Sequence, residues 1–61
     1  MSMYKFSKSE INGIVSHIAA FDATILSMTP DTDFYVIELD ITIDQDQYVH
    51  LQEEYGLMEV V

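Results

Sequence analysis

The clearest pattern of apolar and polar positions lies in residues 34–43, FYVIELDITI. Alternate side chains on one side of this stretch are all apolar: Tyr35, Ile37, Leu39, Ile41 and Ile43. The other side changes along its length from apolar to polar: Phe34, Val36, Glu38, Asp40 and Thr42. A period of two places the two sets on opposite faces of a β-strand, and most of these residue types pack well on a pleated surface. The pattern predicts a ten-residue central strand with one face against a core.

A helix is predicted to begin near Ser7. Residues 7–10 (SKSE) match a capping box, and Phe6 and Ile11 flank it as a hydrophobic staple. Four apolar residues then follow at helical spacing and predict one buried stripe: Ile11, Ile14, Val15 and Ile18. Glycine costs a helix up to about 1 kcal/mol relative to alanine. Gly13 is therefore expected to permit close packing against another backbone.

The end of this helix has two interpretations. Apolar spacing of three and four continues through Phe21, Ile25 and Met28, so one long helix could reach the boundary set by Pro30. Alternatively, the helix ends near Asp22, and residues 24–28 form a strand that turns through TPDTD onto residues 34–43. We favour this hairpin, because a lone strand needs a neighbour within its own chain. Under the long-helix interpretation, the neighbour would come from a second copy.

A second helix is predicted after the central strand. Residues 42–45 and 44–47 form overlapping cap signatures, and the helix dipole favours acidic residues in the first turn. Tyr48, Leu51 and Tyr55 lie on one face of this helix. Gly56 fits the left-handed residue that ends a helix, and Leu57 is expected to fold back onto it.

Short apolar stretches at residues 1–6 and 58–61 are predicted as edge strands. The order of elements is then (β)-α-β-β-α-(β). We therefore predict an α+β fold in one domain over residues 1–61, with a central strand at 34–43 and two helices packed on one face of the sheet.

The chain has little interior for its apolar content. It has 61 residues, of which 49% are hydrophobic, and a domain of this size buries only about 60% of its unfolded surface. It contains no cysteine, which excludes disulfides and thiolate zinc sites. Part of the apolar surface is therefore expected to lie in a subunit or partner interface, and we predict a homodimer.

Charge is distributed unevenly along the chain. Eleven acidic residues and two lysines give a net charge of −9. Residues 1–30 sum to zero, whereas residues 31–61 hold nine acids and neither lysine nor arginine. A negative field repels nucleic acids and anionic membranes and attracts basic surfaces or cations. The alternative is that the acidity serves only to keep a small apolar protein in solution.

Known catalytic and metal-binding patterns do not fit this sequence. Asp44-x-Asp46 begins like a calcium loop, but Tyr48, Val49 and Tyr55 stand where that loop needs an acid or Asn, a glycine and a glutamate. Phosphate loops and nucleophile elbows are missing, and two glycines could not build either. We predict no metal, no cofactor and no enzymatic activity.

We expect a non-enzymatic binding or inhibitor protein that occupies a basic, nucleic-acid-binding type of surface on a protein partner. Alternate strand residues are separated by roughly 6.6 Å, on the order of the spacing of phosphates along one DNA strand. In size and charge the chain resembles small viral inhibitors that occupy such surfaces. The predicted contact residues are Glu38, Asp40, Asp44, Asp46, Glu53 and Glu54. Because tyrosine is enriched at interfaces, the predicted interface residues are Tyr48, Tyr55, Ile11, Ile14 and Ile18.

Two other functions fit the same composition. One is a structural or assembly subunit whose acidity is only solubilising. The other is a protein that sequesters a small ligand in a pocket at the dimer seam. No stretch approaches the ~18 apolar residues of a membrane span, and the first residues lack the pattern of a secretion signal. We therefore expect a cytoplasmic protein without membrane contact.

Overall fold

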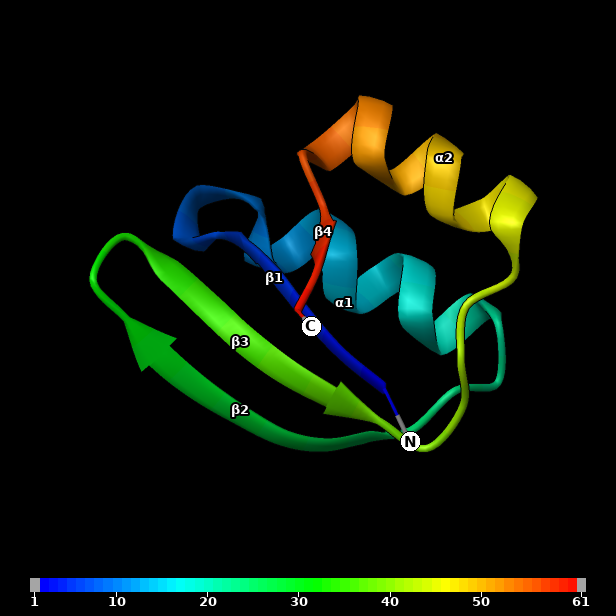
Figure 1. Cartoon of the computed structure of the whole chain (residues 1–61), viewed down its shortest axis with the longest axis horizontal. Helices are drawn as coiled ribbons and strands as arrows, with labels where there is room; N and C mark the ends of the chain where they lie inside the picture. Colours follow the sequence, from blue (N-terminus) through cyan, green and yellow to red (C-terminus); the bar gives the residue numbers. More distant parts are fainter. Residues whose placement is uncertain (1, 61) are drawn as a thin grey trace.

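The computed structural model describes residues 2–60, which form a four-stranded sheet with two helices on one face (Figure 1). The elements are β1 (Ser2–Ser7), the 3-10 turn η1 (Lys8–Glu10), α1 (Ile11–Ala20), β2 (Ile25–Asp31), β3 (Phe34–Leu39), α2 (Gln45–Tyr55) and β4 (Met58–Glu59). The strand order is β2-β3-β1-β4, and all neighbours are antiparallel. The predicted α+β class and order of elements are confirmed. This βαββαβ order is the split βαβ, or ferredoxin-like, arrangement, which hosts many unrelated functions.

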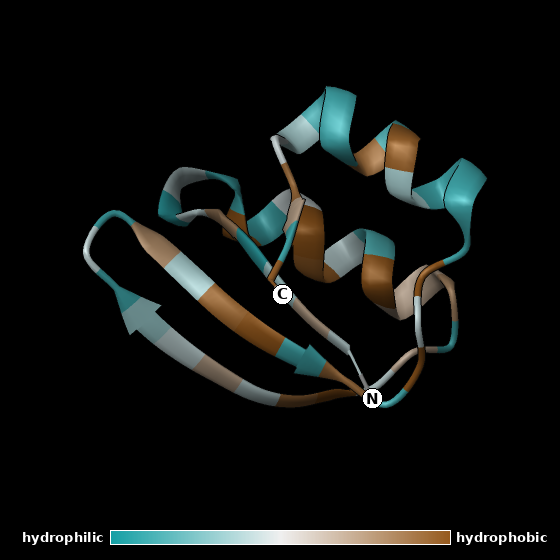
Figure 2. Cartoon of the chain, in the orientation of Figure 1, coloured by the Kyte–Doolittle hydropathy of each residue, from teal (hydrophilic) through white to brown (hydrophobic). Residues whose placement is uncertain are grey.

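The two faces of β3 are as the sequence predicts. Ile37 and Leu39 are fully buried, whereas Glu38 between them belongs to the opposite face of the sheet. Ile37 lies opposite Tyr4 of β1 and Met28 of β2. Figure 2 shows apolar segments on both β3 and α1, and the buried residues of the two elements belong to one core.

The central strand is shorter than predicted, because it ends at Leu39 rather than at residue 43. The backbone N–H of Asp40 donates to the carbonyl of Thr24, and the Asp40 carboxylate accepts from the N–H of Thr24 at 2.9 Å. These two bonds fasten the chain leaving β3 to the loop before β2, just beyond the last ladder pair of Ile25 and Leu39. Ile41 is consequently 41% exposed, whereas Ile43 is buried and donates its N–H to the Tyr4 hydroxyl.

The hairpin interpretation is confirmed, and the long helix is wrong. Helix α1 ends at Ala20, and Asp22 adopts a positive φ of 60° that breaks the helix. The following strand is longer than the predicted 24–28, because residues 29–31 of the expected turn pair with β3. The turn between β2 and β3 is therefore formed by Thr32 and Asp33. Pro30 is accommodated because β2 is an edge strand, where a missing N–H costs no ladder bond.

The first strand is an inner strand and not the predicted edge. β1 pairs with β3 on one side and with β4 on the other, which allows Tyr4 and Phe6 to be fully buried. β4 is an edge strand as predicted, over Met58–Glu59. Met1 and Val61, the outer ends of the two predicted terminal strands, lie outside the described residues.

The predicted capping box at Ser7 is wrong, because Ser7 is the last residue of β1 and makes no side-chain cap bond. Its hydroxyl lies 3.1 Å from the Ser9 hydroxyl instead, and α1 begins only after η1. The caps of α2 are confirmed. Asp44, rather than Thr42, caps the helix by accepting from the N–H of Gln47 at 2.9 Å.

Gly56 ends α2 in the left-handed conformation, with a φ of 72°. The N–H of Leu57 then reaches back to the carbonyl of Leu51, and both of these side chains are fully buried. The core between the layers consists of Tyr4, Phe6, Ile14, Ile18, Ile37, Leu39, Ile43, Leu51 and Leu57. Among the described helices, none combines the length and the apolarity that crossing a membrane requires.

Replacing Leu39 with Asp is expected to unfold the domain. A buried charge without a partner costs several kcal/mol, whereas a core of this size rarely supplies more than about 3–5 kcal/mol. Glu38→Gln, one residue away on the other face, is the matched control and should melt close to the wild type. Thermal melts followed by circular dichroism measure both variants, and equal stability of the two would contradict the assignment of the strand faces.

Candidate functional site

The structure divides the six predicted acidic contact residues into three groups. Asp40 and Asp44 are held by bonds within the chain, because each carboxylate accepts a backbone N–H at 2.9 Å. Glu38 is half-buried on the face of the sheet that the helices do not cover. The remaining three acids are exposed residues of α2: Asp46, Glu53 and Glu54. Glu38 therefore does not continue the acidic row of α2, because the sheet separates them.

The outward side of α2 is acidic. Its buried side contains Leu51, with Tyr48 and Tyr55 half-buried beside it. At 100° per residue the opposite side consists of exposed residues only, which we call the outer stripe of α2: Asp46, Val49 and Glu53. Glu54 flanks this stripe, and Figure 2 shows hydrophilic residues over much of the helix. Within residues 2–60, these three carboxylates accept no side-chain hydrogen bond.

Both lysines lie away from these carboxylates, against aromatic rings. The ammonium nitrogen of Lys5 lies 4.7 Å from the centre of the Phe34 ring, and that of Lys8 lies 5.4 Å from the centre of the Tyr35 ring. Across the part of the chain that the structure describes, no lysine or histidine nitrogen lies within 4.0 Å of a carboxylate oxygen. The negative charge of α2 is therefore not balanced by a neighbouring cation of this chain.

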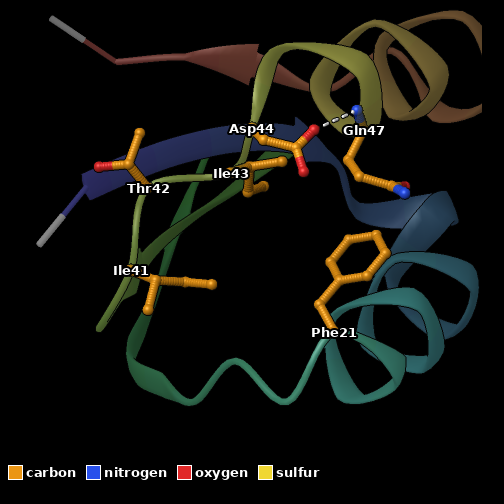
Figure 3. A pocket seen from close by; sticks show the side chains of 6 residues that line it. All are labelled: Phe21, Ile41, Thr42, Ile43, Asp44 and Gln47. Carbon is orange, nitrogen blue, oxygen red and sulfur yellow. Dashed lines mark hydrogen bonds between the residues drawn. The ribbon is translucent and has the colours of Figure 1, made fainter.

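A cavity of about 290 Å³ opens between the end of α1 and the start of α2. Its walls are Phe21, Ile41, Thr42, Ile43, Asp44 and Gln47. Figure 3 shows Phe21 and Ile41 directed into the hollow, with Asp44 at its rim. One Asp44 oxygen accepts from the N–H of Gln47, which leaves the second oxygen available to a ligand. An apolar floor with a carboxylate at the rim suits a hydrocarbon chain that ends in a positive charge.

Aromatic and imidazole groups meet at the seam between α1 and α2. The Nδ1 atom of His17 lies 3.0 Å from the Tyr55 hydroxyl, and the rings of His17 and His50 are 5.7 Å apart. A β-carbon placed on Gly13 would stand 2.5 Å from the Tyr55 ring. The close approach predicted at Gly13 is therefore made by a side chain rather than by another backbone. Within residues 2–60, no group of three or more His, Asp or Glu side chains is arranged to hold a metal ion.

The predicted interface residues mainly hold the fold together. Ile14 and Ile18 belong to the core and offer no surface to a partner. Tyr48 and Tyr55 are half-buried, and their hydroxyls are engaged, with the Glu59 N–H and with His17 respectively. Ile11 is also half-buried and packs against the core. Ile14 and Ile18 are therefore unavailable to a partner, whereas the half-buried Ile11, Tyr48 and Tyr55 each retain some exposed surface.

No pattern in the sequence indicates the cavity directly. Ile41 follows the period-two pattern of the buried strand face, so its exposure appears only once the strand ends at Leu39. Phe21 was placed in a helical stripe, and the chain break at Asp22 turns it toward residues 41–44 instead. The signal that could have revealed this break is Asp22 itself, because aspartate tolerates the left-handed conformation.

Comparison with models of known protein families, with curated proteins and with solved structures finds no match to this chain. Its function is therefore inferred from the placement and the charge of its own residues.

Gly13→Ala is expected to destabilise the protein, although alanine normally stabilises a helix by up to about 1 kcal/mol relative to glycine. The added methyl group displaces the Tyr55 ring and separates its hydroxyl from His17. In a Tyr55→Ala background the same change should become neutral or stabilising. Denaturant unfolding of the four proteins gives the coupling energy of this cycle. An effect of Gly13→Ala that is equal in both backgrounds would contradict the contact.

Proposed function

We propose that this chain is a non-enzymatic binding protein that uses α2 and the adjoining cavity to occupy a basic surface on a protein partner. The observation that carries the proposal is the exposed, unbalanced acidity of α2. Asp46, Glu53 and Glu54 are exposed, and both lysines of the chain lie over aromatic rings of the sheet. In this role the carboxylates take the place of the phosphates of a nucleic acid, so the partner is a nucleic-acid-binding or similarly basic protein.

Charge placement favours a binding role over simple solubility. A solubilising charge works anywhere on a surface, and interspersed charges of both signs serve it well. Helix α2 carries three acids and no lysine or arginine among eleven residues. A patch of one sign raises the association rate with an oppositely charged surface. The cost is self-repulsion within the folded chain, which a partner of opposite charge relieves.

The cavity supplies a specific contact beside this general attraction. An arginine or lysine side chain of the partner fits it, because the alkyl stem can pack on Ile41 and the cationic end can approach the free oxygen of Asp44 (Figure 3). The Phe21 ring in the same wall offers a further cation–π contact. A volume of about 290 Å³ is at the lower limit for small-molecule pockets, which favours a single side chain over a free ligand.

A cytoplasmic location is part of this proposal, because nucleic-acid-binding proteins with basic surfaces are found there. The runner-up is a structural or assembly subunit whose acidity is only solubilising. It differs in one measurable respect: the position of the acidic residues would not matter to binding.

Charge reversal on α2 is expected to weaken binding of the partner that the wild type captures from extracts of its source. Asp46→Lys with Glu53→Lys should lower the affinity at least tenfold, mainly through slower association. The matched control is Asp31→Lys with Asp33→Lys, which changes the net charge equally on two exposed residues near the far hairpin. Surface plasmon resonance on variants shown to be folded by circular dichroism measures both. Equal binding by the wild type and both variants would mean that the acidity only solubilises.

Ile41→Lys tests the cavity separately. The alkyl chain of the introduced lysine can fill the cavity, and its ammonium group can reach toward Asp44. We therefore expect a several-fold loss of affinity for the partner with an unchanged melting temperature. Ile41→Met keeps the apolar wall and should bind as the wild type does. The substituted side chain is 41% exposed in the native protein, so neither change disturbs the core. Wild-type affinity of Ile41→Lys would remove the cavity from the proposed contact.

A further inference from the structure

We propose that a second copy of this chain docks on the face of the sheet that the helices leave open, and that the two copies pack sheet against sheet about a two-fold axis. We call this surface the open face and define it by Met3, Lys5, Val36, Glu38, Met58 and Val60. This inference does not depend on the proposed contact of α2 with a basic partner, because it uses the opposite side of the molecule.

Strand register assigns these residues to one surface. Val36 and Glu38 alternate with the buried Ile37 and Leu39, so they belong to the other face of β3. Lys5 lies directly opposite Val36, and Met3 lies directly opposite Glu38.

The patch continues onto the edge strand β4. Met58 lies directly opposite Lys5, and the N–H of Val60 bonds the carbonyl of Met3 at 2.9 Å. The six residues therefore form one continuous patch across β3, β1 and β4. Figure 1 shows both helices on the other side of these strands.

The open face brings together three of the exposed large apolar residues in the described part of the chain. Met3 is 43% exposed, and Met58 and Val60 are each 38% exposed. Monomeric proteins rarely leave contiguous apolar patches larger than a few hundred Å² in water. In this small chain, one face of the four-stranded sheet has no layer of helices or strands packed over it.

The charges on the open face favour a second copy of this chain as its partner. The centre of this face holds one positive and one negative residue, Lys5 and Glu38, whereas the chain as a whole carries −9. Asp31 of β2, which lies opposite Phe34, adds one further acid to the same face of the sheet. Two copies therefore repel each other more strongly through their acidic α2 helices than through this surface. A two-fold axis brings the same patch of both copies together, so Lys5 of each copy can meet Glu38 of the other.

The edges of the sheet do not offer an alternative route to a dimer. The outer strand β2 has an irregular register between Ile25 and Ser27 and contains Pro30, which lacks a donor. The other outer strand, β4, has only two residues. Bulges, proline and short edge strands are the usual devices against edge-to-edge pairing. Pairing of two copies through the edges of the sheet is therefore disfavoured.

The available area is sufficient for a reversible dimer. The molecule has 3862 Å² of accessible surface and principal extents of 27 × 23 × 22 Å. A whole side of the molecule thus offers on the order of 600 Å², so a pair of copies can bury at most about 1,200 Å² in total, at the lower limit of stable protein interfaces. The dimer is consequently expected to dissociate on dilution.

Light scattering after size-exclusion chromatography, over about 1 to 200 µM protein, tests the assembly. The wild type should approach twice the chain mass of 7.0 kDa at the upper end. Met58→Asp with Val60→Asp should remain at 7.0 kDa throughout, with a dissociation constant raised at least tenfold. Val15→Asp with Val49→Asp is the matched control, because these helix residues are also 38% exposed and add the same charge. This control should dimerise as the wild type does.

Charge exchange gives a second test that does not depend on the folding of the first variant. Glu38→Lys alone should weaken the dimer, and the double change Lys5→Glu with Glu38→Lys should restore most of the lost affinity. A wild type of 7.0 kDa at every concentration would overturn the proposal. Loss of the dimer in the Val15 and Val49 control, with retention in the Met58 and Val60 variant, would overturn it as well and would place the contact on the helices.

Discussion

The structure depends on the burial of one face of β3. Ile37 and Leu39 lie at the centre of a core to which both helices contribute, with Ile14 and Ile18 from α1 and Leu51 from α2. A 61-residue chain has material for only these two layers. The apolar residues that exceed this interior must lie on surfaces. The structure places some of them on the open face and in the cavity beside α2, and others, namely Val15, Leu26 and Val49, elsewhere on the helices and on β2.

Charge divides the molecule in the same way as burial does. The ammonium groups of Lys5 and Lys8 lie over rings of β3, so the positive charge of the chain stays with the sheet. The carboxylates of α2 face water on the other side of the core without a compensating base. A nearly neutral apolar face and an acidic face are thus presented in opposite directions. This separation allows self-association and contact with a basic partner to occur on one small chain without competition.

The sequence predicted those parts of the fold that local chemistry determines. The period of two identified the buried face of β3, and Asp44 and Gly56 marked the two ends of α2. The errors lie where distant segments decide. The end of β3 depends on bonds between Asp40 and Thr24, and the inner position of β1 depends on its pairing with both β3 and β4.

The candidate site was predictable in composition but not in arrangement. The acidic residues were identified, and their placement required the fold: Asp40 and Asp44 serve the backbone, Glu38 lies across the sheet, and only the acids of α2 are exposed together. The Ser7 capping box failed for a similar reason, because β1 takes Ser7 into its ladder opposite Phe34. Local sequence patterns identify the residue types, whereas the pairing of strands that are distant in the sequence determines which residues share a surface.

If the exposed carboxylates of α2 act through electrostatic attraction to a basic partner, salt must slow the association of the two proteins. The most direct measurement is the association rate constant of the wild type with its captured partner, followed from about 0.05 to about 0.5 M salt, where the screening length falls several-fold. Attraction through these carboxylates predicts a steep fall in the association rate and a nearly constant dissociation rate. An association rate that does not change with salt would contradict it.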